Sequence, residues 1–281
     1  MIALSGYSAF FDASADAGES EVVTVVAGFL ATVEASEQWE IAWRLCLAEF
    51  DVPYFHMKEL LSGKKPYDAK KWKSTSYRVA FISKLIQITK DYAIASVGSL
   101  TKQSIFDFQN QFFELDKRYN PYVLSGRDCA VQVKEFVREK LKSDLPIAFI
   151  FERGDKGRGM LMKEMEASGL PLPIFKHSRP DPKVDDPPLI QLQACDLLAW
   201  EIRRGKFDAR VKRRLRQTLR DLGQVRHKLW FEAHNDDVGR LIRLARIPLR
   251  PAWKHLENLD NLERLQRERQ TQSRVIGSRK I

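Results

Sequence analysis

The segment SAFFDASADAGESEVVTVVAGFLAT, residues 8–32, places a single carboxylate, Asp12, at the end of an apolar run. Residues 8–11 and 21–29 have the composition of two strands, and the Ala-Asp-Ala-Gly at 15–18 is typical of a turn, so the segment predicts a β-hairpin. A lone charge is costly where a strand enters the core. Asp12 is therefore the first candidate functional residue.

Two more acids border apolar segments. PIAFIF, residues 146–151, is typical of a buried parallel strand and ends in Glu152. Residues 189–203 have the apolar spacing of a helix, which leaves Asp196 beside the buried side. Carboxylate oxygens are the ligands that Mg²⁺ or Mn²⁺ prefers, and two such ions support phosphodiester hydrolysis. On spacing alone, a turn residue, a strand end and a solvated helix position explain the three acids equally well.

The rest of the chain alternates between helical and extended patterns, which predicts an α/β fold. A Pro-rich loop, residues 179–188, is the clearest break. We expect a domain over 1–205, a basic helical extension over 206–255 packed on it, and a charged helical or disordered tail over 256–281. The predicted helices are 34–50, 75–92, 122–141, 157–168, 208–222 and 236–247, and the further strands are 93–100 and 172–177.

Composition excludes several protein classes. The chain has 281 residues and is 44% hydrophobic, which excludes disorder throughout. No segment approaches the roughly 18 uncharged apolar residues of a membrane span, and the N-terminal residues lack signal-peptide features. The three cysteines are far apart in the sequence and are interpreted as reduced thiols. We expect a cytoplasmic protein with no membrane partner.

Positive charge is concentrated near the C-terminus. The net charge is +10, yet residues 203–228 carry 11 basic and 2 acidic side chains, a balance of +9. Such a stretch beside a near-neutral body favours binding to a polyanion, here nucleic acid, although a helix that only improves solubility explains it as well. The candidate phosphate contacts are Arg203, Arg204, Lys212, Arg213, Arg214 and Arg216.

Four short motifs resemble a known bacterial family. FFDASADAG, residues 10–18, resembles the Y-x-D-E-S-G opening of the domain of unknown function 3800 (DUF3800) family, and QACDLLAW, residues 193–200, resembles its closing Q-x-A-D-L-x-A helix. FHMKEL, residues 55–60, resembles its His-containing segment, and FIFERGD, residues 149–155, falls where the family has an acidic strand end. The resemblance implies a ribonuclease H-like fold, with a mixed five-stranded sheet flanked by helices.

The resemblance also implies a site. Asp12, Glu152 and Asp196 correspond to the acids of the first strand, the fourth strand and the late helix. Ala13 stands where the family usually has Glu, and Ala15 replaces its Gly, so one carboxylate is missing from the opening motif. The candidates for a further ligand are Asp16, Glu59 and Asp155, and His56 and Gln193 are expected near the pocket.

The leading hypothesis is a nuclease that uses Mg²⁺ or Mn²⁺ to hydrolyse DNA or RNA. Asp12, Glu152 and Asp196 would bind the metal, and the basic extension would hold phosphates without reading sequence. The alternative, which Ala13 favours, is a catalytically inactive module on the same fold that binds nucleic acid or protein.

Overall fold

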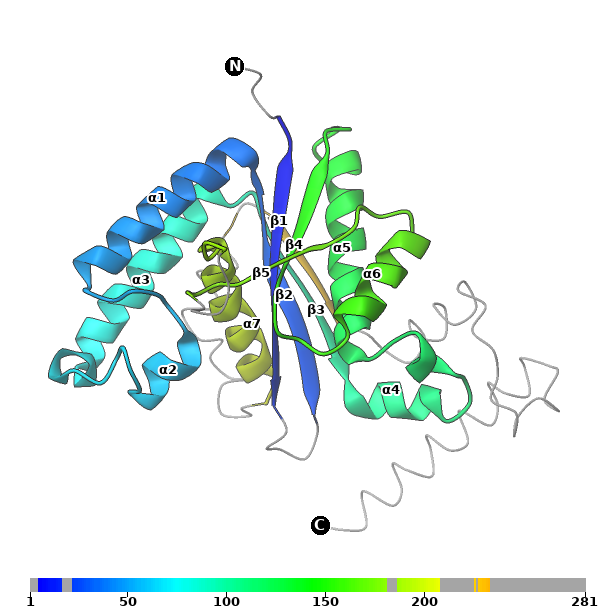
Figure 1. The fold of residues 1–281 in the computed structure, drawn as a ribbon, viewed down its shortest axis with the longest axis horizontal. Helices are drawn as coiled ribbons and strands as arrows, with labels where there is room; N and C mark the ends of the chain where they lie inside the picture. The colour runs from blue at the N-terminus through cyan, green and yellow to red at the C-terminus, as the bar shows by residue number, and fades with distance from the viewer. Residues whose placement is uncertain (1–4, 17–21, 181–185, 208–224, 226, 233–281) are drawn as a thin grey trace, which may run out of the picture.

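The computed structural model describes residues 5–16, 22–180, 186–207, 225 and 227–232. These form a six-stranded mixed sheet with helices on both faces (Figure 1). The strand order is β5-β4-β1-β2-β3-β6. The strands are β1 Tyr7–Asp16, β2 Val23–Thr32, β3 Ala95–Lys102, β4 Ile147–Glu152, β5 Ile174–Lys176 and β6 His227–Glu232.

The predicted hairpin is confirmed and lies at the centre of the sheet. β1 pairs antiparallel with β2, with Asp12 opposite Ala27, and it pairs parallel with β4 on its other side, with Phe11 opposite Phe151. One detail of the prediction was wrong: Ala15 and Asp16 belong to β1 and not to the turn. They pair with β2, and these strand contacts outweigh the turn preference of the local sequence.

Alternation along β1 decides which side chains face which helices. Phe10 packs in the core cluster with α1 (Val33–Glu49) and α7 (Gln191–Phe207), whereas Phe11 packs in the cluster with α5 (Pro121–Glu139). Asp12 follows the parity of Phe10. Its side chain therefore lies on the α7 face of the sheet, the face toward which Asp196 is carried.

Helices cover the two faces unequally (Figure 1). On the α7 face, α1 and α3 (Thr75–Tyr92) complete the larger core cluster, and on the other face α5 packs on β2 and β3 with α6 (Arg158–Ala167) beside it. Three helices begin at a residue whose side chain accepts a hydrogen bond from a backbone amide. Thr32 accepts from Ala35 N, Ser74 from Tyr77 N and Asn120 from Val123 N.

Two expectations about the C-terminal region need correction. The sheet has six strands and not five, because residues 227–232 form β6, parallel to β3, inside the predicted helical extension. The segment HKLWFE has only three consecutive apolar residues, so its pattern is weak, and the open edge of β3 supplies the pairing that makes it a strand. Helix α7 also runs to Phe207, past the expected boundary at 205. The predicted helices 208–222 and 236–247 and the tail 256–281 lie outside the described residues.

Four shorter features were not predicted as helices. These are α2 (Met57–Ser62), α4 (Gln103–Asn110) and two 3₁₀ turns at Lys70–Lys73 and Leu115–Lys117. Each is too short for a helical period to stand out in the sequence. α2 matters most, because it supplies a backbone contact to the acidic site. Of the helices in the described part of the chain, none has the length and apolar content to cross a membrane.

Candidate acidic site

The candidate site lies where β4 ends beside the middle of β1, which continues past Asp12 to Asp16. Phe11 pairs with Phe151, so Asp12 and Glu152 are the next residues along two neighbouring parallel strands. Asp155 follows in the turn that connects β4 to α6, and Asp196 lies in the second turn of α7. Three distant segments of the chain therefore supply acids to one region.

Electrostatics shows that the four carboxylates interact. Burial raises the pKa of Asp12 well above its usual range, and the charges of Asp196, Glu152 and Asp155 raise it further, in that order. A local contact opposes this rise: the Ala13 amide donates to Asp12 Oδ1 at 2.7 Å and lowers the pKa. The pKa of Asp12 therefore depends on the charges of all three other acids.

Burial dominates at the neighbouring acids as well. It raises the pKa of Glu152 to about 7, against the lowering influence of Ser178 and Arg179, and it raises the pKa of Asp155 to about 6. Glu152 Oε2 is buried and has no hydrogen-bond partner among the residues that the structure describes. Unpartnered buried carboxylate oxygens are uncommon, since each carries a desolvation cost that nothing offsets.

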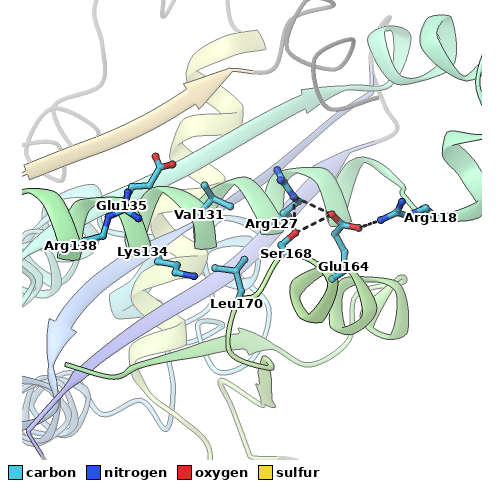
Figure 2. A pocket seen from close by; sticks show the side chains of 10 residues that line it. Arg118, Arg127, Val131, Lys134, Glu135, Arg138, Glu164, Ser168 and Leu170 are labelled. Atoms are coloured by element: carbon cyan, nitrogen blue, oxygen red, sulfur yellow. Dashed lines mark hydrogen bonds and ion pairs between the residues drawn. The ribbon is translucent and has the colours of Figure 1, made fainter. Parts of the chain in front are cut away.

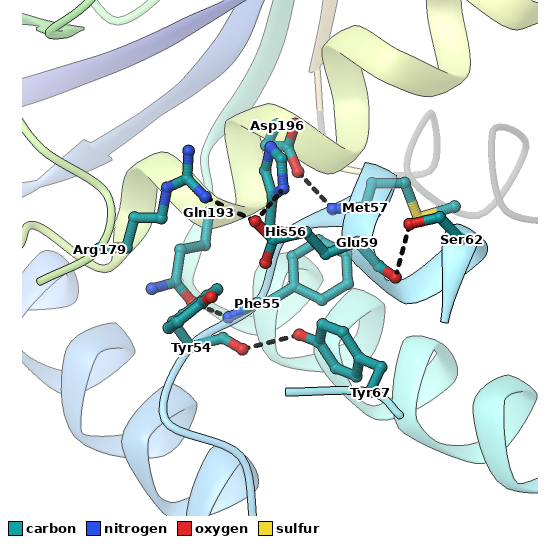
Figure 3. Close-up of polar contacts among 10 residues, drawn as sticks. All are labelled: Tyr54, Phe55, His56, Met57, Glu59, Ser62, Tyr67, Arg179, Gln193 and Asp196. Atoms are coloured by element: carbon teal, nitrogen blue, oxygen red, sulfur yellow. Dashed lines mark hydrogen bonds and ion pairs between the residues drawn. The ribbon is translucent and has the colours of Figure 1, made fainter. Parts of the chain in front are cut away.

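Asp196 is oriented by α2 and its flanking residues (Figure 3). The Met57 amide donates to Asp196 Oδ2 at 2.7 Å. Burial raises the pKa of Asp196, while His56, the Met57 amide and Arg179 lower it. Glu59 joins the group from the same helix: its Oε1 lies 3.4 Å from His56 Nδ1 and accepts a hydrogen bond from Arg179 Nη1 at 2.8 Å.

Gln193 has a structural role in this arrangement. Its Oε1 accepts from Trp43 Nε1 at 3.0 Å and from the Phe55 amide at 2.8 Å, and its Nε2 donates to the Ser178 carbonyl at 2.6 Å. Both ends of the amide are therefore occupied. Gln193 fixes the approach to α2 and the segment before Arg179 against α7, which positions Asp196 one turn further on.

The remaining predicted residues are distributed as follows. Asp16 lies at the end of β1, on the parity of Asp12, and its side chain falls outside the described part of the structure. Arg203 donates to Ser14 Oγ on β1 at 2.9 Å, and the Arg204 guanidinium lies 5.0 Å from the centroid of the Trp200 ring. The other predicted phosphate contacts lie outside the described residues: Lys212, Arg213, Arg214 and Arg216.

Two residues near the acids were missed by the sequence interpretation. Arg179 lies in the Pro-rich loop, where the sequence indicated only a break, and it is the cation that contacts Glu59. Tyr122, in the first turn of α5, has a buried hydroxyl that no group in the described ranges pairs with. Burial raises its pKa, and the charges of Asp155 and Asp12 raise it further. No local pattern marks either residue, because both reach the site through tertiary packing.

The fit of the site to a divalent cation has two sides. Within the described ranges, no three or more His, Cys, Asp or Glu side chains are already grouped so that they could hold a metal ion. The donor chemistry nevertheless suits Mg²⁺ or Mn²⁺: the acids are half-buried oxygen donors, three of them raise the pKa of Asp12, and Glu152 Oε2 has no hydrogen-bond partner among the described residues. Side-chain rotation toward a shared cation would replace their repulsion by attraction.

Comparisons of the chain with protein-family models, curated proteins and solved structures found no match.

Proposed function

We propose that this chain is a divalent-metal-dependent nuclease with a ribonuclease H-like fold. One observation carries the proposal: Asp12 is half-buried beside Asp196, Glu152 and Asp155, which raise its pKa, and in the described part of the chain none of these four carboxylates forms an ion pair. Repeated burial of uncompensated acids is expensive for a purely structural purpose. A bound cation would offset that cost.

The sheet topology supports the fold assignment. The DUF3800 resemblance implies acids at the ends of the first and fourth strands and on a late helix. Glu152 ends β4 and Asp196 lies on α7, whereas Asp12 lies within β1, which continues to Asp16. β6 is an addition at the β3 edge. Ala13 packs with the core cluster on the α5 face, opposite the parity of Asp12, so its lack of a carboxylate leaves the α7-facing acids intact.

The residues of the site would have separate roles in binding the metal and the substrate. Asp12 and Glu152 are held on strands, which fix their positions better than loops would. Asp196 is fixed by the Met57 amide. Arg179, whose side chain is 44% exposed, offers a guanidinium to a substrate phosphate. A bound Mg²⁺ or Mn²⁺ supplies activation of the attacking water and stabilisation of the leaving oxygen.

The proposal is tested by titrating the protein with MnCl₂ in a calorimeter and by assaying cleavage of labelled single-stranded DNA, duplex DNA and RNA. We expect binding and cleavage in the wild type and loss of both in Asp12→Asn and Asp196→Asn. Asp68→Asn, at an exposed position, is the matched control and should retain both. Absence of Mn²⁺ and Mg²⁺ binding at millimolar concentration contradicts the proposal.

A second candidate function is a catalytically inactive module that binds nucleic acid. The absence of a ready-made metal-ligand group among the described residues favours it, together with the +9 balance of residues 203–228. It predicts metal-independent binding that weakens with salt. Replacing Arg213, Arg214 and Arg216 by Gln should lower the log-log salt slope by about 0.9 per lost phosphate contact on duplex DNA. An unchanged slope assigns the stretch to solubility or to a protein partner.

A further inference from the structure

A basic hollow lies on the opposite side of the sheet from the acids. It has a volume of about 410 Å³ and is formed between α5, α6 and the residues that follow α6. Figure 2 shows Arg118, Arg127 and Ser168 around Glu164, with Lys134 and Arg138 further along α5. Four cationic and two anionic side chains line the hollow, so positive charge is in excess.

One of the anionic side chains is already neutralised. Glu164 has a side chain only 5% exposed, and its two carboxylate oxygens lie 3.0 Å from Arg118 Nη2 and 3.2 Å from Arg127 Nε. Ser168 Oγ also lies 3.3 Å from Glu164 Oε1. The Glu164 carboxylate therefore orients both guanidinium groups. Orienting carboxylates of this kind fix an arginine fork for a ligand and reduce the entropy lost on binding.

Two of the cations, Arg127 and Lys134, keep hydrogen-bond donors for a ligand. Arg127 uses Nε toward Glu164 and Nη1 toward Asp128, and in the described part of the structure its Nη2 makes no hydrogen bond. Lys134 Nζ donates once, to the Gly169 carbonyl at 2.9 Å, and an ammonium group has three donors. Arg127, Lys134 and Arg138 recur at i, i+7 and i+11, so they line one face of α5.

A second hollow continues the first. Its volume is about 310 Å³, and Lys134 and Arg138 line both hollows. The rest of its wall is largely apolar and includes Leu145, Pro146 and Pro171. Leu145 is 43% exposed, which leaves an apolar surface open to a ligand. The pair of hollows thus combines a cationic compartment, a shared cationic border and an apolar compartment.

We propose that these two hollows form a binding site for an organic diphosphate of nucleotide size, separate from the acidic site. The diphosphate lies over Arg127, Lys134 and Arg138, and the organic part lies against Leu145 and its neighbours. Concave sites of a few hundred Å³ with apolar walls and a few convergent polar groups are typical of small-molecule binding. Arginine forks and lysine ammonium groups are the usual partners of phosphate oxygens.

Calorimetry with ADP, pyrophosphate and adenosine tests the site. The titrations are done in EDTA, so that the acidic site cannot recruit a phosphate through a divalent cation; failure here leaves the nuclease proposal untouched. We expect ADP to bind, pyrophosphate to bind more weakly, and adenosine to show no measurable binding. No ADP binding at millimolar concentration overturns the site.

Surface variants separate a built site from general charge attraction. Lys134→Gln/Arg138→Gln should bind ADP at least about tenfold more weakly, because charge-assisted hydrogen bonds are lost. Lys163→Gln, an exposed lysine on α6 outside both hollows, is the control and should bind as the wild type does. An equal loss in both variants, or no loss in the double variant, overturns the assignment. Thermal melting confirms that each variant is folded.

The apolar compartment has its own test. Leu145→Ser should weaken ADP binding and leave pyrophosphate binding unchanged, because only the organic part contacts that wall. The side chain is partly exposed, so the substitution is compatible with folding. If pyrophosphate binds as tightly as ADP, or if Leu145→Ser binds ADP like the wild type, the organic part has no place in the second hollow and the nucleotide assignment fails.

Discussion

A buried carboxylate lies on one face of the sheet and half-buried carboxylates lie on the other, and their surroundings differ. On the α5 face, Glu164 is held by two arginines and a serine of its own chain. On the α7 face, Asp12 has one backbone amide and three neighbouring acids that raise its pKa. The chain thus neutralises a buried acid with its own arginines where that acid stabilises the fold. The lack of such pairing around Asp12 points to a cation from outside the chain.

Removing the partners of Glu164 should give the largest effect on stability. In Arg118→Gln/Arg127→Gln the carboxylate stays buried without a cation, and we expect a loss of about 3 kcal/mol in the free energy of unfolding. Urea unfolding at pH 7 measures it. Adding Glu164→Gln to the double variant should restore most of the loss, because the buried charge is then gone. If the double variant is as stable as the wild type, Glu164 is solvated and the contrast between the faces is wrong.

The same measurement on the α7 face should give the opposite sign. In EDTA, Asp12→Asn should be at least as stable as the wild type, because one member of a repelling set is neutralised. Mn²⁺ at 100 times its dissociation constant should then stabilise the wild type by about 2.7 kcal/mol and Asp12→Asn not at all.

A structural role for Asp12 predicts a different pattern. If Asp12 serves only to accept the Ala13 amide within β1, Asp12→Ala should lose about 1 kcal/mol with and without Mn²⁺. Asn can itself accept the Ala13 amide, so both substitutions must be melted side by side. Equal stabilisation of wild type and Asp12→Asn by Mn²⁺ would show that the metal binds elsewhere.

The acids should also leave a signature in the pH dependence of stability. The pKa of Glu152 is raised from 4.5 to about 7, so the folded protein holds a proton that the unfolded chain releases at lower pH. The free energy of unfolding of the metal-free protein should therefore fall as pH rises from about 4.5 to about 7. Glu152→Gln should flatten this fall by on the order of 1 kcal/mol, since each pKa unit corresponds to about 1.4 kcal/mol and neighbouring acids share the proton. Unfolding curves at pH 5 and pH 7.5 decide it. An identical fall in Glu152→Gln would assign the effect to other groups.

How far the sequence predicts this molecule depends on the range of the interactions. The strands around Asp12 and Glu152 and the helix around Asp196 are predictable because their apolar periods are local. β6 is not, since HKLWFE becomes a strand only through the open edge of β3. The contact of Arg179 with Glu59, and of Arg118 with Glu164, joins residues far apart in the chain. The charge run predicts a binding surface over residues 203–228. The described basic hollow is formed by single cations that do not stand out in the sequence.

Arg179 is the exception to the contrast between the faces, and its removal should give the smallest and most informative change. It donates to Glu59 Oε1 at 2.8 Å and lowers the pKa of Glu152 and, together with His56, that of Asp196. Because its side chain is 44% exposed, Arg179→Gln should lose less than about 1 kcal/mol of stability.

Metal affinity should change in the other direction. The guanidinium repels an incoming divalent cation, so Mn²⁺ should bind Arg179→Gln about fivefold more tightly, roughly 1 kcal/mol. Cleavage should nevertheless fall, because the phosphate contact is lost. Arg179→Lys keeps the charge without the fork, and should keep the wild-type Mn²⁺ affinity while cleaving more slowly. Calorimetry and single-turnover cleavage on the same preparations separate the two effects. If Arg179→Gln binds Mn²⁺ more weakly, Arg179 orients Glu59 for metal binding. Arg179 would then pair with Glu59 as Arg118 pairs with Glu164, and the contrast between the two faces would fail.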